Sequence, residues 1–221
     1  YNASATGSAA FAYASDKLAA GMTHTCAIMD NAGMACWGGD TNGQLGNGGG
    51  NTNILHPGGS TNLPTGRTAV ALSAGGAHTC AILDNGDLIC WGRDDHGQLG
   101  DGGSNIERNR ASSVTAINLG TGRTAVAVSA AYHHTCAILD NGDLKCWGWD
   151  RDGQLGDGGT THGPTTYTTA PSTTAIDLGT GRTAVAVSAG ITHTCAILDN
   201  GELKCWGRDD YGQLGDGGSN T

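Results

Sequence analysis

The chain has 221 residues, of which 39 are glycine and one is phenylalanine, and only 38% are hydrophobic. It is long enough for one domain but poor in material for one large core, so thin repeated layers fit the composition better. The formal net charge is −9 and no lysine or arginine cluster occurs, which argues against nucleic acid or an anionic membrane as a partner. No apolar run approaches the roughly 20 residues of a membrane span.

The N-terminal segment, residues 1–15, is small and polar and is predicted to be a strand or an arm. It carries the one N-glycosylation sequon of the chain, at Asn2. The chain begins with Tyr1, and the segment lacks the basic start and apolar core of a signal peptide. We therefore interpret the chain as a mature secreted protein whose leader has been removed.

One pattern then occurs four times, starting at His24, His78, His134 and His193. The first cysteines of the copies lie 54, 56 and 59 residues apart. Such a period predicts supersecondary units that are each too small to bury their own apolar face and are completed by a neighbour. We place the arm at 1–15 and the repeats at 16–50, 51–103, 104–159 and 160–221.

Each copy predicts a β-hairpin. In the second copy, residues 80–83 and 88–91 are typical of short strands, and Asp84-Asn85-Gly86 supplies the turn. If these three residues form a loop closed by a glycine bulge, Cys80 faces Cys90. Directly opposed Cβ atoms lie about 4.5–5.5 Å apart, which is close to what a disulfide needs.

The same register divides the eight cysteines into four Cys-x9-Cys pairs: Cys26 with Cys36, Cys80 with Cys90, Cys136 with Cys146, and Cys195 with Cys205. The alternatives are buried free thiols and a zinc site, although zinc sites use shorter Cys spacings. Disulfides at this density indicate an oxidising compartment. We therefore expect an extracellular location.

A further strand is predicted before each hairpin. In residues 69–73 the alternation of small and apolar residues places Val70 and Leu72 on one face. A glycine-rich block follows each hairpin, and in it Leu99 is expected to fill the core. The first repeat has Asn31-Ala32-Gly33 at its hairpin turn, where the others have Asn-Gly-Asp or Asn-Gly-Glu, so the length of that turn stays open.

Variable segments separate the repeats at residues 51–65, 104–119 and 160–178, as is typical of surface loops. The third is rich in threonine and proline, like an O-glycosylated stalk, although a plain polar loop is the alternative. Its candidates for glycosylation are Thr165, Thr166, Thr168, Thr169, Thr173 and Thr174.

The order of histidine, strand, Asp-Asn-Gly turn, strand, Trp-Gly and Gly-Gln-Leu-Gly resembles the repeat of the RCC1 (regulator of chromosome condensation) family. The resemblance covers nearly all of residues 16–218, and the Cys-x9-Cys form looks like secreted bacterial relatives. It implies an all-β fold of β-propeller blades, usually seven. Because this chain has four repeats, we expect blades that stay open or are completed head to tail. The nucleotide-exchange activity of the family's best-known, chromatin-bound member does not suit an acidic, disulfide-bearing chain.

One histidine and one tryptophan recur in every repeat. Recurrent histidines are compatible with metal binding, but they lie about one layer apart and each precedes a core strand, so we interpret them as structural. The tryptophans are interpreted as packing anchors. These repeat-core residues are His24, His78, His134, His193, Trp37, Trp91, Trp147 and Trp206. Outside the pattern stand Trp149, a candidate for sugar stacking, and His56, His96, His133 and His162.

Acidic blocks at residues 94–101, 150–157 and 209–216 are compatible with calcium, because hard oxygen ligands in glycine-rich loops suit that ion. They lack the EF-hand spacing and its terminal glutamate, so turn carboxylates in water are the preferred interpretation. We predict no metal and no cofactor. No Ser-His-Asp, paired-carboxylate or phosphate-loop motif stands out, so we also predict no enzymatic activity.

The predicted function is that of an extracellular structural or interaction protein. From the last glycine of each Gly-Gln-Leu-Gly block to the next repeat's first cysteine the spacing is 34, 36 and 39 residues, and it is 32 when the end of one chain is joined to the start of another. The chain therefore closes on itself, with residues 1–21 completing the fourth repeat, or adds the next chain through its N-terminal arm, or is a fragment of a longer protein; we favour a filament. The alternative is an adhesive propeller that recognises glycan or protein through its variable loops.

Overall fold

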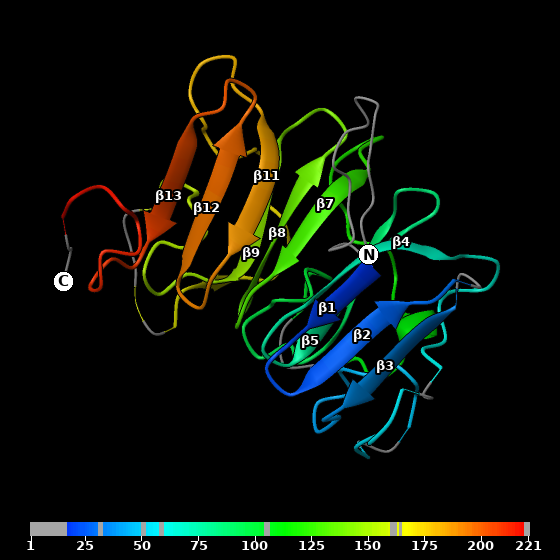
Figure 1. Cartoon of the computed structure of the whole chain (residues 1–221). Coiled ribbons are helices and arrows are strands. Elements are labelled where there is room, and N and C mark those ends of the chain that lie inside the picture. Colours follow the sequence, from blue (N-terminus) through cyan, green and yellow to red (C-terminus); the bar gives the residue numbers. More distant parts are fainter. Residues whose placement is uncertain are drawn as a thin grey trace, which may run out of the picture.

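The computed structural model describes residues 17–30, 33–49, 52–57, 60–103, 107–159, 163 and 165–218. These residues form four small antiparallel sheets, one for each repeat, which follow one another in chain order (Figure 1). The all-β class and the blade architecture are thus confirmed. The strands are β1 (Leu18–Ala20), β2 (His24–Ile28), β3 (Met34–Gly38), β4 (Ala69–Ala74), β5 (His78–Leu83), β6 (Leu88–Gly92), β7 (Ala125–Ala130), β8 (His134–Leu139), β9 (Leu144–Trp149), β10 (Tyr167–Thr168), β11 (Ala184–Ala189), β12 (His193–Leu198) and β13 (Leu203–Gly207).

The hairpin of each blade has the predicted register. In the second blade Ile82 lies opposite Leu88 and Cys80 lies opposite Cys90. Gly86 closes the turn with φ +82°, a conformation that favours glycine, and its N–H donates to the Leu83 carbonyl. The first blade keeps the same pairing of Cys26 with Cys36 on β2 and β3, despite its different turn sequence.

The first strand of a blade departs from the predicted alternation. Leu72 is buried, but Val70 is 51% exposed, so the expectation that both share one face is wrong. The reason is a β-bulge between Ala69 and Ala71, which inserts Val70 as an extra residue opposite β5 and turns its side chain outward. The same shift exposes Val126 and Val185 in the third and fourth blades.

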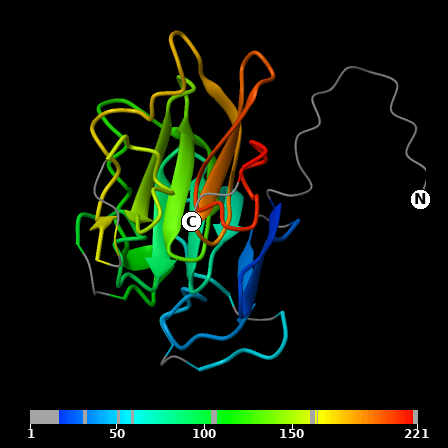
Figure 2. The ribbon, with the colours of Figure 1, turned by 90° about the vertical axis from the view of Figure 1, so that its left-hand side faces the viewer.

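Most of the core lies between blades. Three separate apolar clusters fill the junctions of blades 1 and 2, 2 and 3, and 3 and 4. Each junction packs the middle strand of one blade against the first strand of the next, as β5 packs against β7. The first and last blades lie at opposite ends of the stack (Figure 1), and the C-terminal blade lies in front when the stack is seen from its side (Figure 2).

The variable segments run along the outer edge of the blade that precedes them. Gly92 at the end of β6 pairs with Arg108, and the Ile117 N–H donates to the Leu88 carbonyl. A short 3-10 turn, η2 (Ala111–Ser113), lies in this segment. After the third repeat, β10 pairs with β9 and makes that sheet four-stranded, so this part of the threonine-rich segment belongs to the blade.

The N-terminal strand β1 pairs with β2 and completes the first blade, while the fourth blade has three strands of its own. Residues 18–20 therefore do not complete the fourth repeat. The arm at 1–15 and the sequon at Asn2 lie outside the described residues. Among the described residues, no helix is long and apolar enough to span a membrane.

Candidate functional site

Each blade has two different faces. We call the face that packs on the preceding blade the leading face; in the second blade it carries Leu83 and Trp91. The face that packs on the following blade is the trailing face, which carries Ile82, Leu88 and Leu99. We call the junction of a trailing face with the next leading face a seam. The recurrent residues of the sequence gather at these seams.

At the seam between blades 2 and 3, the recurrent histidine, threonine and tryptophan side chains make hydrogen bonds that join the two blades. The Thr135 hydroxyl donates to the Gln98 carbonyl at 2.9 Å, and the Trp147 indole Nε1–H donates to the same oxygen at 3.1 Å. His78 Nε2 lies 2.9 Å from Thr135 Oγ1. Because the Thr135 proton is already used, His78 must donate from Nε2, which fixes its tautomer.

The other two seams repeat these bonds. His24 Nε2 lies 2.8 Å from Thr79 Oγ1, and His134 Nε2 lies 2.9 Å from Thr194 Oγ1. Burial lowers the pKa of His24 to about 4 and that of His78 to about 3, so both are neutral at pH 7. These histidines are therefore structural donors, as the sequence indicated, and they bind the next blade.

The last glycine of each Gly-Gln-Leu-Gly block lets the tryptophan of the next blade approach. Gly100 has φ +73°, and a Cβ added there would lie 2.5 Å from Trp147 Nε1. A side chain at this position would push the indole out of the seam. Leu99 beside it is fully buried, as predicted.

The two end blades present half of a seam each. On the trailing face of blade 4, Leu203 is 65% exposed, whereas its equivalent Leu144 is fully buried. A groove of about 520 Å³ opens there beside Leu203 and Leu214. On the leading face of blade 1, Met29 is 47% exposed, whereas Leu83 at the same position is 3% exposed.

The burial of the recurrent tryptophans and histidines depends in the same way on a neighbouring blade. Trp91 and Trp147 are fully buried at seams, while Trp37 on the leading face of blade 1 is only half-buried. His193 on the trailing face of blade 4 is also half-buried. Trp206 lies at the third seam, where its Nε1–H donates to the Gln154 carbonyl at 3.0 Å, and it is half-buried because no blade covers its other side.

All four expected cysteine pairs form disulfides, each with Cα atoms 4.1 Å apart.

The acidic blocks form turns. Asp94 Oδ1 accepts the Leu99 N–H at 3.0 Å, and Asp101 Oδ1 accepts the Gly103 N–H at 2.9 Å. Equivalent bonds occur in the blocks that begin at residues 150 and 209. Among the glycosylation candidates, Thr165, Thr173 and Thr174 are exposed, and Thr166, Thr168 and Thr169 are half-buried.

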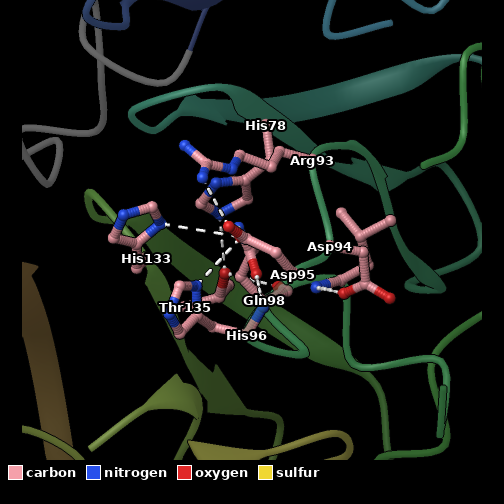
Figure 3. Close-up of polar contacts among 9 residues, drawn as sticks. His78, Arg93, Asp94, Asp95, His96, Gln98, His133 and Thr135 are labelled. Atoms are coloured by element: carbon pink, nitrogen blue, oxygen red, sulfur yellow. Dashed lines mark hydrogen bonds and ion pairs between the residues drawn. The ribbon is translucent and has the colours of Figure 1, made fainter. Parts of the chain in front are cut away.

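Sequence reasoning missed one group of side chains. His96 and His133, which follow no repeat pattern, lie together with Asp95 at the outer end of the seam between blades 2 and 3 (Figure 3). Trp149 lies beside both histidines. The only signal was indirect: His96 precedes the Gly-Gln-Leu-Gly block and His133 precedes the recurrent His134, and both of these motifs meet at a seam.

Four stacked antiparallel blades, joined by a repeated seam, define the class of repeat-built β-propellers. A model of the RCC1 (regulator of chromosome condensation) repeat matches residues 36–82, 85–138 and 141–197, and a second model of this repeat matches 69–98, 125–154 and 184–213. The chain therefore belongs to the RCC1 repeat family.

Among proteins of known identity, the chain is 29% identical over 201 residues to the ultraviolet-B receptor UVR8 of Arabidopsis thaliana, which covers 91% of this chain and 43% of the receptor. It is 29% identical over 209 residues to the human E3 ubiquitin-protein ligase HERC2, which covers 90% of this chain and 4% of the ligase. The chain thus spans less than half the length of these relatives.

Solved structures show the same fold. Prp20p from Saccharomyces cerevisiae matches with a TM-score of 0.73 at 20% identity, over 94% of this chain and 49% of that one. Human WBSCR16 matches with a TM-score of 0.71 at 21% identity, over 86% of this chain and 46% of that one. Identities this low support the fold alone.

Proposed function

We propose that this chain is an extracellular structural protein that binds further copies of itself head to tail and so builds a filament. The observation that carries the proposal is the pair of open faces: the trailing face of blade 4 exposes Leu203, which its equivalents bury, and the leading face of blade 1 exposes Met29. A second copy could cover both, because the two faces are the two halves of one repeated seam.

The polar groups of the two ends also complement each other. At an inner seam, histidine and the glutamine carbonyl of one blade bind threonine and tryptophan of the next. Blade 4 offers His193 and the Gln213 carbonyl, and blade 1 offers Thr25 and Trp37, at the same positions of the repeat. A joint between copies would therefore gain apolar burial and three hydrogen bonds without any new type of contact.

The joint would be heterologous, since a trailing face binds a leading face. A heterologous contact produces a closed ring if its rotation closes and an open filament if it does not. Residues 1–15, which lie outside the described residues, are proposed to extend over the neighbouring chain and strengthen the joint.

The extracellular location is supported by the four disulfides, because such bonds persist in oxidising compartments. A binding role is favoured over catalysis by the use of the recurrent polar groups. His24, His78 and His134 bind threonine across seams, and the carboxylates of the acidic blocks bind backbone N–H groups.

Sedimentation velocity and negative-stain electron microscopy at rising protein concentration test this function. We expect species longer than one chain whose share grows with concentration, at a salt concentration of about 0.15 M that screens the net charge. A chain lacking residues 1–15 should form shorter assemblies while keeping its disulfides. Compact single chains at the highest concentration would contradict the proposal.

A second candidate function is recognition of a glycan or protein ligand. It is favoured by aromatic rings near the seam of blades 2 and 3, where Trp149 lies near His96 and Tyr167 is 38% exposed. Such rings stack on sugar faces. Saturable binding to a defined sugar on a glycan array, lost in a Trp149→Ala variant, would establish this function instead.

A further inference from the structure

Three potential metal ligands converge at the outer end of the seam between blades 2 and 3 (Figure 3). Asp95 and His96 lie in the turn after β6, and His133 directly precedes β8. One ligand atom from each lies within 4.8 Å of the other two. His96 Nδ1 is 2.9 Å and His133 Nδ1 is 4.0 Å from the same oxygen, Asp95 Oδ1.

His133 is the most deeply buried of these three residues. Its residue is only 8% exposed, and its Nδ1 has no hydrogen-bond partner among the described residues, although it points at Asp95 (Figure 3). A buried polar atom without a partner costs free energy, so the position requires an explanation. Burial, with the nearby His96 and Arg93, lowers the pKa of His133 to about 4, so the imidazole is neutral at pH 7.

Both oxygens of Asp95 have protein partners, and Oδ1 is the one that faces the two imidazoles. Arg93 binds Oδ2, and Gln98 Nε2 donates to Oδ1 at 3.2 Å. Burial raises the pKa of Asp95, but its hydrogen bonds with His96, Gln98 and Arg93 lower it by more, so the net shift is downward. A carboxylate oxygen with two imidazoles is a ligand set that suits a divalent transition metal.

The repeats provide an internal comparison. Blade 4 has the same pairing of Arg208 with Asp210, but Tyr211 occupies the position of His96. The arginine–aspartate pair therefore belongs to the turn itself, and the two imidazoles distinguish the seam between blades 2 and 3 from the turn of blade 4. At the positions of Asp95, His96 and His133 the other two seams have Thr41, Asn42 and Ala77, and Arg151, Asp152 and Thr192.

We propose that Asp95, His96 and His133 bind one divalent transition-metal ion, with zinc as the physiological candidate, and leave a fourth position open for water. Zinc bonds of about 2.0–2.2 Å place tetrahedral ligands about 3.3 Å apart. Contraction of the present cluster needs side-chain movements of about 1 Å.

Aromatic rings around the two imidazoles restrict their movement. The ring centroids of His133 and His96 lie 4.6 Å apart, and those of Tyr132 and Trp149 lie 4.2 and 5.5 Å from that of His133. These rings restrict the imidazoles to few orientations. Because Asp95 and His96 belong to blade 2 and His133 to blade 3, the ion would join two blades and stabilise the seam.

The test uses the full chain with its disulfides intact, freed of metal by a chelator and dialysed. Zinc is added in isothermal titration calorimetry, and cobalt is added with detection of its d–d absorption. We expect one ion per chain, and a rise in thermal midpoint with zinc concentration.

Removal of a ligand should weaken zinc binding by more than about 100-fold, since loss of an outer partner of a ligand alone costs about 10–100-fold. The variants are His96→Gln and His133→Asn. The matched controls are Asp210→Asn, at the turn without imidazoles, and His56→Gln, an exposed histidine; both should bind like the unchanged chain.

His96 decides the outcome if His133→Asn fails to fold, because the side chain of His96 is partly exposed and tolerates the change. Retention of zinc affinity by His96→Gln would overturn the proposal, as would the absence of binding to the unchanged chain at about 0.1 mM zinc. Loss of binding in the His56→Gln control would place the ion elsewhere and also overturn it. These measurements of zinc binding do not depend on association of the chain with further copies of itself.

Discussion

The inner seams and the two outer faces of the stack are made from the same repeat, yet they differ sharply in burial. Leu144 is fully buried, whereas Leu203, at the same position one repeat later, is 65% exposed. The difference lies in the neighbour, since a repeat cannot bury its own faces. A repeated motif therefore predicts a contact only where a second blade is present to accept it.

The largest difference is expected at the tryptophans. Replacing the fully buried Trp147 by alanine should lower the free energy of unfolding by about 3–5 kcal/mol, because it leaves a cavity and removes the bond to the Gln98 carbonyl. Trp37 is half-buried, because no preceding blade covers it. Replacing it by alanine should lower the free energy of unfolding by less than half of that amount. Urea unfolding of both variants, followed by circular dichroism, measures the two losses; equal losses would refute the comparison.

The disulfides provide a second comparison between an inner blade and an outer blade. Replacing Cys80 and Cys90 together by serine should cost about 2–3 kcal/mol by the loop-entropy model. The pair Cys195 and Cys205 closes a loop of the same length, so its chain-entropy contribution is the same. Calorimetric comparison of the two double variants separates loop closure from packing. If the inner pair loses more free energy of unfolding, the excess is the packing contribution. A larger loss at the outer pair would contradict the account.

A threonine-to-valine change isolates the polar part of a seam. Thr135→Val keeps the shape but removes the donor to the Gln98 carbonyl and leaves His78 Nε2 without its acceptor, which should cost about 1–3 kcal/mol. Thr25→Val at the open face should change stability by less than about 0.5 kcal/mol in the isolated chain. Both values come from chemical denaturation at low protein concentration, where association does not contribute.

Acidification should weaken the seams. The pKa of His24 is lowered by burial to about 4 in the folded chain and is about 6.5 when unfolded, so below pH 6.5 the unfolded state binds a proton that the folded state does not. Stability is therefore lost as pH falls from 6.5 toward 4. From pH 7 to pH 5.5 the loss is at most about 1.4 kcal/mol. A His24→Asn variant should show a flatter pH profile of the urea midpoint; an unchanged profile would contradict this assignment.

Much of the blade could be predicted from the sequence, because it depends on local patterns. The Asp-Asn-Gly turn set the hairpin register, and the register placed Cys80 opposite Cys90. Val70 was placed on the wrong face because the bulge at this strand depends on its pairing with β5, which strand alternation does not encode. The strand β10 was missed for a similar reason, since its pairing with β9 is a long-range contact.

The candidate metal site could not be predicted because its residues come from two repeats. His96 and His133 are 37 residues apart in the chain and follow no shared pattern. They meet only because a seam brings the turn after β6 against the start of β8. By contrast, the role of His24 and His78 was predictable, since both recur at a fixed position before a core strand.

The central claim is that the outer faces are two halves of one seam, and a mixing experiment tests it most directly. Leu203→Asp blocks the trailing face of blade 4, and Met29→Asp blocks the leading face of blade 1; both side chains are exposed, so the chain should fold. Mass photometry or sedimentation should find each variant alone at the 22.2 kDa of one chain, and the mixture at twice that mass and no more. A mixture that stays at single-chain mass, or a variant that pairs with itself, would contradict the account.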